Sequence, residues 1–422
     1  MSIEDHNIEN KIDLTQRRED QIQYEYKKEN HTRSEPTKYN SSKLQEHELL
    51  INIGPQHPST HGVLRLEVIL DGEIVVDLIP HLGYLHRCFE KHAESLPYNQ
   101  IIPYVDRMDY VAAMNSEHVF AMGVEKLLGI DQQIPKRVEY IRVLMAELNR
   151  IASHFIAIGT YGMDMGAYTA FLWMMRDREH IVRLFEWASG ARLLYNYIWI
   201  GGLFYDLPLG FEEKCEEFIS YLRPKIKEIE TLITENKIFI NRTANVGVLP
   251  FELGINYGVS GPMLRASGLR YDLRKVDQYS VYPEIDFDIP IGKGLMGTTG
   301  DCWDRTYVRV LECYESLKIM EQCLEKLKKE YPRTRDFDPQ ALVPKKIRPK
   351  SEEIYVRGET PKGELGFYFR STENKDIPFR CKARSCSFSN LSVISEISKE
   401  VLLSDLIAII GSIDIIMGEI DR

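Results

Sequence analysis

The chain has 422 residues, a formal net charge of −10 and seven cysteines. Its apolar content of 44% and charged content of 27% are those of a folded soluble protein. The acidic balance argues against nucleic acid as the main partner. An odd number of cysteines without any Cys-x-x-Cys pair argues against a disulfide framework and favours a reducing compartment.

The two ends of the chain differ in character. Residues 1–45 are polar, carry both charge signs and almost lack apolar runs, so we expect a disordered tail and no signal or transit sequence. Residues 401–418 are the most membrane-like, but Asp405 and Asp414 interrupt them, and each would cost about 2.5–3.5 kcal/mol at a bilayer centre. We expect a buried segment there, with membrane contact only through a partner.

A stiff loop, GPQHPSTHG at 54–62, lies between strand-like segments. His57 and His61 are four apart, but Pro58 excludes the helix that would turn both toward one metal ion. The metal interpretation therefore lacks a geometric basis. The flanking sequence predicts a small antiparallel sheet, with strands at 48–53, 63–70 and 73–79.

Helical periodicity follows this sheet. The first helix is expected after Pro103. Its stripe recurs every four positions and places Tyr110 on that helix, together with Met114, His118 and Met122. Apolar residues three and four apart predict a central bundle of long helices. The other four helices are expected at about 138–155, 167–199, 218–233 and 303–328.

A second small sheet is predicted over residues 353–385, after a Pro- and Lys-rich surface connection. The architecture is therefore α+β, a helical bundle flanked by two antiparallel sheets. The chain is divided into a tail, an N-terminal β region containing the loop, a helical core, a linker with the second β region, and a C-terminal helix and tail. Their bounds are 1–45, 46–104, 105–330, 331–395 and 396–422.

Several residues allow a structural and a functional interpretation. GKGLMG at 292–297 matches G-x-G-x-x-G, but no second strand follows on schedule, which favours a flexible loop over a nucleotide site. A lone loop histidine such as His61 is more often structural, and a tyrosine in a helical stripe such as Tyr110 is usually core. Asp164 lies in a helix-breaking stretch, where it can cap a helix beginning near Gly166.

Five motifs occur together and in order: GPQHPSTHGVLRL, GYLHRCFEK, DRMDYVAAM, SGPMLRASGLRYDLRK and GSIDIIMGEIDR. They resemble the D-type subunit of NADH:quinone oxidoreductase, the large peripheral-arm subunit of respiratory complex I, over about 46–422. The resemblance implies a fold like that of the nickel–iron hydrogenase large subunit. It also implies descent from that hydrogenase subunit, which holds its metal with two cysteine pairs. These pairs correspond here to Asp109 with Ala112 and to Ile416 with Glu419. No thiolate is left, so the resemblance implies that a quinone headgroup occupies the former metal site.

The resemblance also assigns individual residues. The headgroup histidine falls on His61, the headgroup tyrosine on Tyr110, and the aspartate that pairs with the histidine on Asp164. Cavity-lining positions fall on Asp414 and Ile416.

The resemblance also implies a partner subunit that carries the terminal iron–sulfur cluster and completes the quinone site. Arg87 matches the arginine near the partner's iron–sulfur cluster, and His57 is expected to be structural. The chain departs from some family members at Phe204 and Tyr205, where those members carry a histidine near the cluster. Trp199 also replaces an arginine of some members.

The implied activity is reduction of quinone to quinol with electrons from NADH, coupled to proton translocation by a membrane arm. The chain is then one subunit of an enzyme and binds no cofactor itself, while NADH, FMN and iron–sulfur clusters belong to partner subunits. We expect it on the cytoplasmic side of a bacterial inner membrane, or alternatively on the matrix side of the mitochondrial inner membrane. The alternatives are a hydrogenase large subunit, an NAD-dependent dehydrogenase that uses GKGLMG, and a purely structural assembly subunit.

Overall fold

The computed structural model describes residues 45, 47–56, 61–334 and 336–422. The chain divides into two compact units, Met1–Leu49 and Leu50–Arg422. His57 and nearly all of the predicted tail lie outside the described residues. The predicted division of residues 46–422 into four parts stays a prediction.

The first sheet follows the predicted pattern. Its strands are β1 (Glu48–Ile53), β2 (Arg65–Asp71) and β3 (Ile74–His81), in the order β1-β2-β3. β2 and β3 are antiparallel and joined by a tight turn. Alternate side chains of β2, Leu66 and Val68, are buried, as expected for a strand with one face on the core.

The region around Tyr110 differs from the prediction. Two short helices come first, α2 (Phe89–Ala93) and α3 (Tyr98–Asp106), and Pro103 lies inside α3. The next helix, α4, begins only at Ala113 and runs to Leu128. Tyr110 therefore lies in the α3–α4 turn, residues 107–112, and not on a helix. The carboxylate of Asp109 accepts the backbone N–H groups of Val111 and Ala112 at 3.2 and 3.3 Å, which stabilises a turn in place of a helix.

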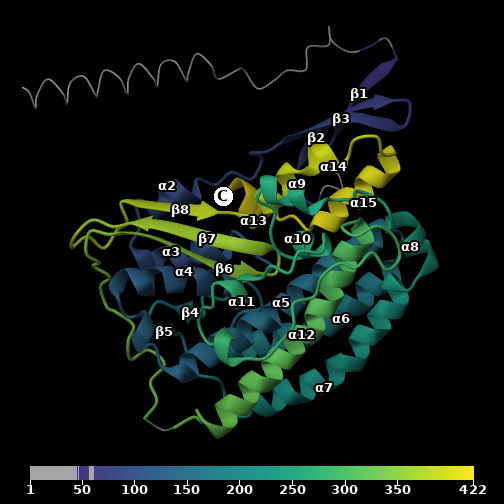
Figure 1. Ribbon diagram of the computed structural model, residues 1–422. Coiled ribbons are helices and arrows are strands. Elements are labelled where there is room, and N and C mark those ends of the chain that lie inside the picture. The colour runs from purple at the N-terminus through teal and green to yellow at the C-terminus, as the bar shows by residue number, and fades with distance from the viewer. Residues whose placement is uncertain (1–44, 46, 57–60, 335) are drawn as a thin grey trace, which may run out of the picture. The chain divides into compact units, whose positions relative to one another are not determined.

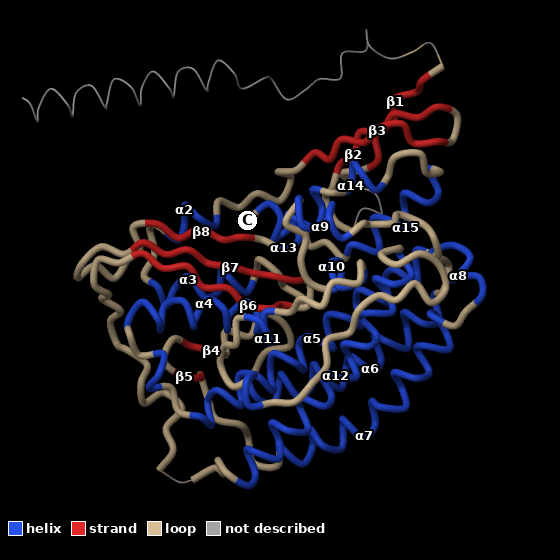
Figure 2. Tube along the Cα trace, viewed as in Figure 1, coloured by secondary structure: helices blue, strands red, loops and turns tan. Residues whose placement is uncertain are grey.

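The predicted helical bundle is confirmed. It consists of α5 (Lys136–Asp164), α6 (Tyr168–Ser189), α7 (Phe211–Ile229) and α12 (Cys302–Lys329), which lie side by side in Figures 1 and 2. α6 ends ten residues earlier than predicted, because Gly190 ends it in a left-handed conformation with φ 80°. The following residues form the short strands β4 (Ile198–Trp199) and β5 (Gly202–Leu203).

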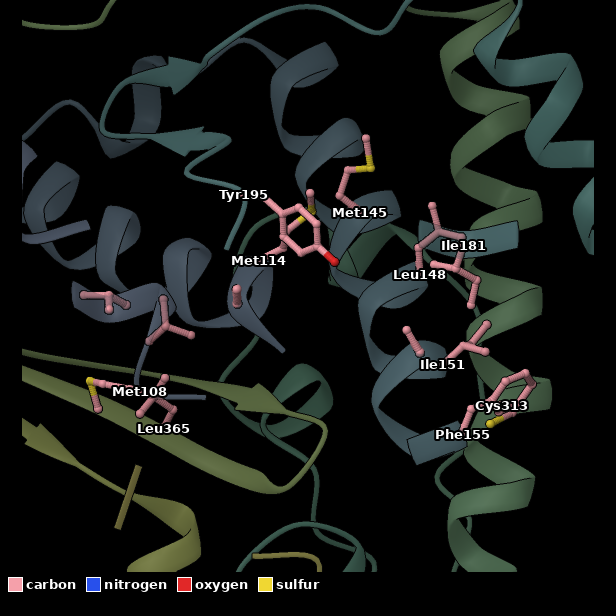
Figure 3. Packing of buried hydrophobic residues seen from close by; sticks show 14 of the residues in the cluster. Met108, Met114, Met145, Leu148, Ile151, Phe155, Ile181, Tyr195, Cys313 and Leu365 are labelled. Carbon is pink, nitrogen blue, oxygen red and sulfur yellow. The ribbon is translucent and has the colours of Figure 1, made fainter. Parts of the chain in front are cut away.

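α5 is the central helix of the core. Its apolar residues Leu148, Ile151 and Phe155 face Ile181 of α6 and Cys313 of α12 (Figure 3). Complete burial of one such aliphatic or aromatic side chain contributes about 1.5–3 kcal/mol. The apolar stripe that predicted this helix is therefore the contact surface that holds the bundle together.

The elements between the long helices are short. A 3-10 turn, η3 (Asp131–Gln133), precedes α5, and a π-helical turn, η4 (Glu230–Thr234), extends α7. The predicted loop at 292–297 is confirmed, and the Asp304 carboxylate ties it down by accepting the Gly294 N–H at 2.9 Å. The remaining short elements are α8 (Lys237–Thr243), α9 (Phe251–Asn256), α10 (Pro262–Ala266), α11 (Leu273–Val276) and η5 (Tyr282–Glu284).

The second predicted sheet is also confirmed, and with it the α+β class. β6 (Glu353–Thr360), β7 (Gly363–Arg370) and β8 (Arg380–Arg384) are antiparallel in that order. Phe120 of α4 packs against Phe367 and Phe369 of β7, with ring centroids 5.4 and 5.3 Å apart. The sheet therefore covers α4, as Figure 1 shows.

Four short helices close the chain: α13 (Cys386–Ser392), α14 (Ile394–Ile397), α15 (Leu403–Ile413) and α16 (Met417–Asp421). The prediction of a buried segment at 401–418 is confirmed, because α15 places Leu406, Ile409 and Ile410 in the core. Within the described part of the chain, no helix is both long and apolar enough to span a membrane.

Candidate functional site

His61 and Asp164 form a direct contact, although 103 residues separate them. The distance from His61 Nε2 to Asp164 Oδ2 is 2.8 Å, and the two side chains are 17% and 8% exposed. His61 lies at the end of the predicted loop with a φ of 50°, and Asp164 is the last residue of α5. The tertiary structure thus brings together two residues that were predicted as functional candidates.

The predicted capping role of Asp164 is wrong. α5 continues through Gly162 to Asp164, and the N-cap position of α6 is Ala167, without a side-chain hydrogen bond. A Cβ at Gly162 would lie 3.1 Å from the Ile233 side chain, so this glycine permits close helix packing and does not break the helix. Asp164 is therefore free to bind His61.

The C-terminal segment passes beside this pair. A Cβ at Gly411, on α15, would lie 3.3 Å from Asp164 Oδ2, and a Cβ at Gly62 would lie 3.1 Å from Met417 Cγ. Such close approach requires the small residues. The final motif of the sequence therefore packs on both members of the His61–Asp164 pair or on their immediate neighbours.

The same segment also reaches the turn that carries Tyr110. A Cβ at Gly418 would lie 2.8 Å from the backbone oxygen of Met108. Residues 411–418 thus run from the His61–Asp164 pair to the α3–α4 turn.

Tyr110 is 38% exposed, the most open of the predicted catalytic side chains. Partial burial raises the pKa of its hydroxyl, and the negative charges of Asp109 and Asp414 add to this effect, while Lys362 and Arg87 oppose it. The phenol therefore stays protonated and can donate a hydrogen bond.

Lys362 is a residue of this site that sequence reasoning missed. It lies at the β6–β7 hairpin tip, and its buried Nζ is 3.1 Å from Asp109 Oδ2, 3.1 Å from Ser153 Oγ and 3.9 Å from Asp414 Oδ2. Burial alone would lower the pKa of this ammonium, but the carboxylates of Asp109 and Asp414 raise it above its usual value. A lysine at the tip of a hairpin is normally exposed, so no sequence pattern indicated that Lys362 would be buried in this site.

Asp414 and Ile416 lie where α15 ends and α16 begins. Asp414 adopts a left-handed conformation with φ 60°, and Ile416 is buried. Arg309 of α12, a second residue that the sequence did not reveal, donates to the carbonyl oxygens of Ser412 and Ile413 at 2.8 and 3.1 Å. This arginine satisfies the last carbonyl groups of α15 and so holds the backbone at Asp414 in place.

Glu419, one of the positions that the resemblance aligns with a hydrogenase metal ligand, is buried among polar partners. Glu419 accepts hydrogen bonds from the Cys386 N–H at 2.9 Å and the Ser387 hydroxyl at 2.5 Å. Burial and the Asp109 charge raise the pKa of Glu419. Among the residues that the structure describes, no group of three or more histidine, cysteine, aspartate and glutamate side chains could hold a metal ion.

Arg87 lies at the surface beside the same turn. Its Nη2 donates to the carbonyl oxygens of Arg107 and Gly418 at 2.5 and 3.3 Å.

Phe204 and Tyr205 form an aromatic cluster with Trp199 at the β4–β5 hairpin. The ring centroid of Phe204 lies 5.0 Å from that of Trp199 and 4.3 Å from that of Tyr205.

Comparison with known proteins identifies the family. A family model described as the respiratory-chain NADH dehydrogenase 49 Kd subunit matches residues 164–422. Three bacterial D-type subunits of NADH-quinone oxidoreductase are similar over most of their length. The one from Cytophaga hutchinsonii is 72% identical over 389 residues, 92% of this chain and 99% of the relative. The one from Amoebophilus asiaticus is 69% identical over 398 residues, 94% of this chain and 99% of the relative. The one from Chlorobaculum tepidum is 58% identical over 379 residues, 90% of this chain and 93% of the relative.

These matches confirm the resemblance drawn from the five motifs. They cover nearly the whole chain and nearly the whole of each relative. The chain therefore belongs to the 49 Kd family, the D-type subunits of NADH-quinone oxidoreductase (complex I), and is a subunit of that oxidoreductase.

Proposed function

We propose that this subunit forms the site where electrons from NADH reduce the quinone headgroup to quinol. His61, Tyr110 and Asp164 are the catalytic residues, and Asp414 and Ile416 line the cavity. The observation that carries the proposal is the 2.8 Å contact between His61 and Asp164, beside the C-terminal segment that also packs on the α3–α4 turn.

The chemistry follows from the donors available. Reduction places two negative charges on the two carbonyl oxygens of the quinone, and two protons complete the quinol. The Asp164 carboxylate accepts from His61 Nε2–H, so Nδ1 is the nitrogen that can face the substrate. Nδ1 donates a proton only from the imidazolium, which the Asp164 charge stabilises.

Tyr110 supplies the second proton from its hydroxyl. Its raised pKa keeps the proton in place until a more basic oxygen forms on the quinone. The positive charges of Lys362 and Arg87 then stabilise the tyrosinate that is left. Each proton donor is held by a separate part of the chain, the N-terminal loop and the α3–α4 turn.

The exposure of Tyr110 and Arg87 supports a site that a second chain completes. We assign this role to the iron–sulfur subunit, which passes on electrons received from NADH through FMN. The complex then lies at the cytoplasmic face of a bacterial inner membrane, or alternatively at the matrix face of the mitochondrial one. Loss of the His61 proton changes its contact with Asp164, and this local charge change starts proton translocation in the membrane arm.

The test is quinone reduction by the intact complex carrying Tyr110→Phe, with native and short-chain quinones. We expect a loss of about 10²-fold or more, since a positioned general acid contributes about 10²–10⁴-fold. NADH oxidation with an artificial electron acceptor controls for assembly. Tyr104→Phe, at a similarly exposed tyrosine of α3, is the matched control and should retain activity. Full activity of Tyr110→Phe would leave a purely structural subunit as the better description.

A further inference from the structure

Two fully buried carboxyl groups lie at the base of the turn that carries Tyr110. Asp106 is the last residue of α3, and Glu117 lies in the first turns of α4. Both are 0% exposed. Asp106 therefore precedes the α3–α4 turn that contains Tyr110, and Glu117 follows it.

Each carboxyl uses one oxygen to bind the backbone at residues 196–198, which lead into β4. Asp106 Oδ2 accepts the N–H of Asn196 at 3.1 Å. Glu117 Oε2 accepts the N–H groups of Tyr197 and Ile198 at 2.8 and 2.7 Å. The amide donors therefore satisfy only half of each carboxyl group.

The two carboxyl groups lie next to one another, because they accept from the consecutive backbone amides of residues 196–198. Their other oxygens, Asp106 Oδ1 and Glu117 Oε1, are buried and have no hydrogen-bond donor among the described residues. A carboxylate is only an acceptor, so a hydrogen bond between two carboxyl groups requires a proton on one of them.

The nearby cation Arg107 lowers the pKa of Asp106 but does not form an ion pair with it. In the described part of the chain, neither Asp106 nor Glu117 has an ion pair within 4 Å, and the Arg107 guanidinium at the end of α3 is exposed and donates to the Pro103 carbonyl at 2.7 Å. Burial raises the pKa of Asp106 to about 6, and burial with the Asp106 charge raises the pKa of Glu117 well above its usual range. Two tyrosines lie near the pair, Tyr195 and Tyr197; burial raises the pKa of each hydroxyl, and the charge of Glu117 adds to this effect.

We propose that Asp106 and Glu117 share one proton that holds the two ends of the α3–α4 turn together, and that this proton positions Tyr110 for quinone reduction. Both are positioning residues, since they act through the turn and not on the substrate. Loss of the proton would leave two carboxylates in contact in a buried environment, and their repulsion would separate the ends of the turn. The effect on quinone rests on the function proposed above, whereas the shared proton does not.

The proton itself is tested by infrared spectroscopy of the intact complex at neutral pH. The C=O stretch of a protonated carboxylic acid is separate from the bands of a carboxylate. We expect the spectrum of the complex to lose one such band with Asp106→Asn and with Glu117→Gln. Asp177→Asn, at a buried aspartate of α6 that binds Arg176, is the matched control and should not change this band. A band that survives in both variants would overturn the shared proton.

The positioning role is tested by the KM for quinone as a function of pH. If only the protonated pair holds Tyr110 in place, KM rises by up to about tenfold per pH unit above the pH at which the pair loses its proton. In Asp106→Asn, the new amide can donate to Glu117 at every pH, so the KM should stay constant over the same range. Equal pH profiles in the two proteins would overturn the positioning role, whatever the infrared result.

The two proposals fail in different ways. Full activity of Tyr110→Phe would remove the assigned role of Tyr110 but would leave the loss of the C=O band unchanged. Loss of the band together with an unchanged KM profile would show a shared proton without influence on the quinone site.

Discussion

The contact between His61 and Asp164 is the smallest unit of the proposed site. A histidine held by a carboxylate has a fixed ring orientation, and the charge of the carboxylate stabilises the protonated ring. Both effects depend on an ionised side chain at position 164. Asn and Asp have nearly the same shape, so the substitution removes the charge with little change in packing.

We predict that Asp164→Asn lowers quinone reduction by the complex about 10²-fold, because the positioned acid loses its stabilising charge. The measurement is the rate with native quinone, with artificial-acceptor reduction as the assembly control. Asp288→Asn, at a largely exposed aspartate that pairs with Arg270, should behave as the unmodified complex. Wild-type rates for Asp164→Asn would mean that the pair only ties the loop to α5.

At the scale of elements, the β6–β7 hairpin is tied to the α3–α4 turn by one buried ion pair. Lys362 on the hairpin neutralises Asp109 on the turn and lies near Asp414 at the end of α15. Removal of one partner of a buried pair leaves an unpaired charge in the interior, which usually costs more than the pair contributes.

We predict that Lys362→Met destabilises the full-length chain by about 3–5 kcal/mol in urea unfolding, because Asp109 and Asp414 are left without their cation. The double variant Lys362→Met with Asp109→Asn should be less destabilised than the sum of the two single variants. Additive effects in this cycle would show that the ion pair does not connect the two elements.

At the scale of the whole molecule, a buried charge network connects α5, α10, α12, β6 and the segment around α11. The arginines are Arg150, Arg265 and Arg274, and the carboxylates are Glu147, Asp272, Glu312 and Glu359. Although burial raises the pKa of Asp272, Arg274 and Arg265 lower it to about 2. The network therefore stabilises the fold only while its carboxylates are ionised.

The pH dependence follows from this lowered pKa. An unfolded aspartate has a pKa of about 3.9, so the contribution of Asp272 is present above about pH 4 and is lost as the pH falls toward about 2. We predict a loss of about 2–3 kcal/mol from this group, measured as the change in unfolding free energy over that range. Asp272→Asn should remove this part of the pH dependence, while Asp288→Asn should keep it. An unchanged slope in Asp272→Asn would contradict the role of the network.

The sequence by itself determined the elements whose signal is local. The stripe on α5 and the alternation in β2 predicted a helix and a strand, because the same side chains that create the pattern are the ones that become buried. The five motifs likewise predicted the family, which the comparisons confirm. These features need no knowledge of distant contacts.

Only the tertiary structure decided what depends on residues far apart in the chain. Gly162 packs closely against Ile233 within α5, which continues to Asp164, and there His61 binds it from 103 residues away. Lys362 became a buried residue of the site only because a hairpin more than 200 residues away folds onto Asp109. The energies of burial and ion pairing belong to these long-range contacts, and a local pattern contains no information about which partners will meet.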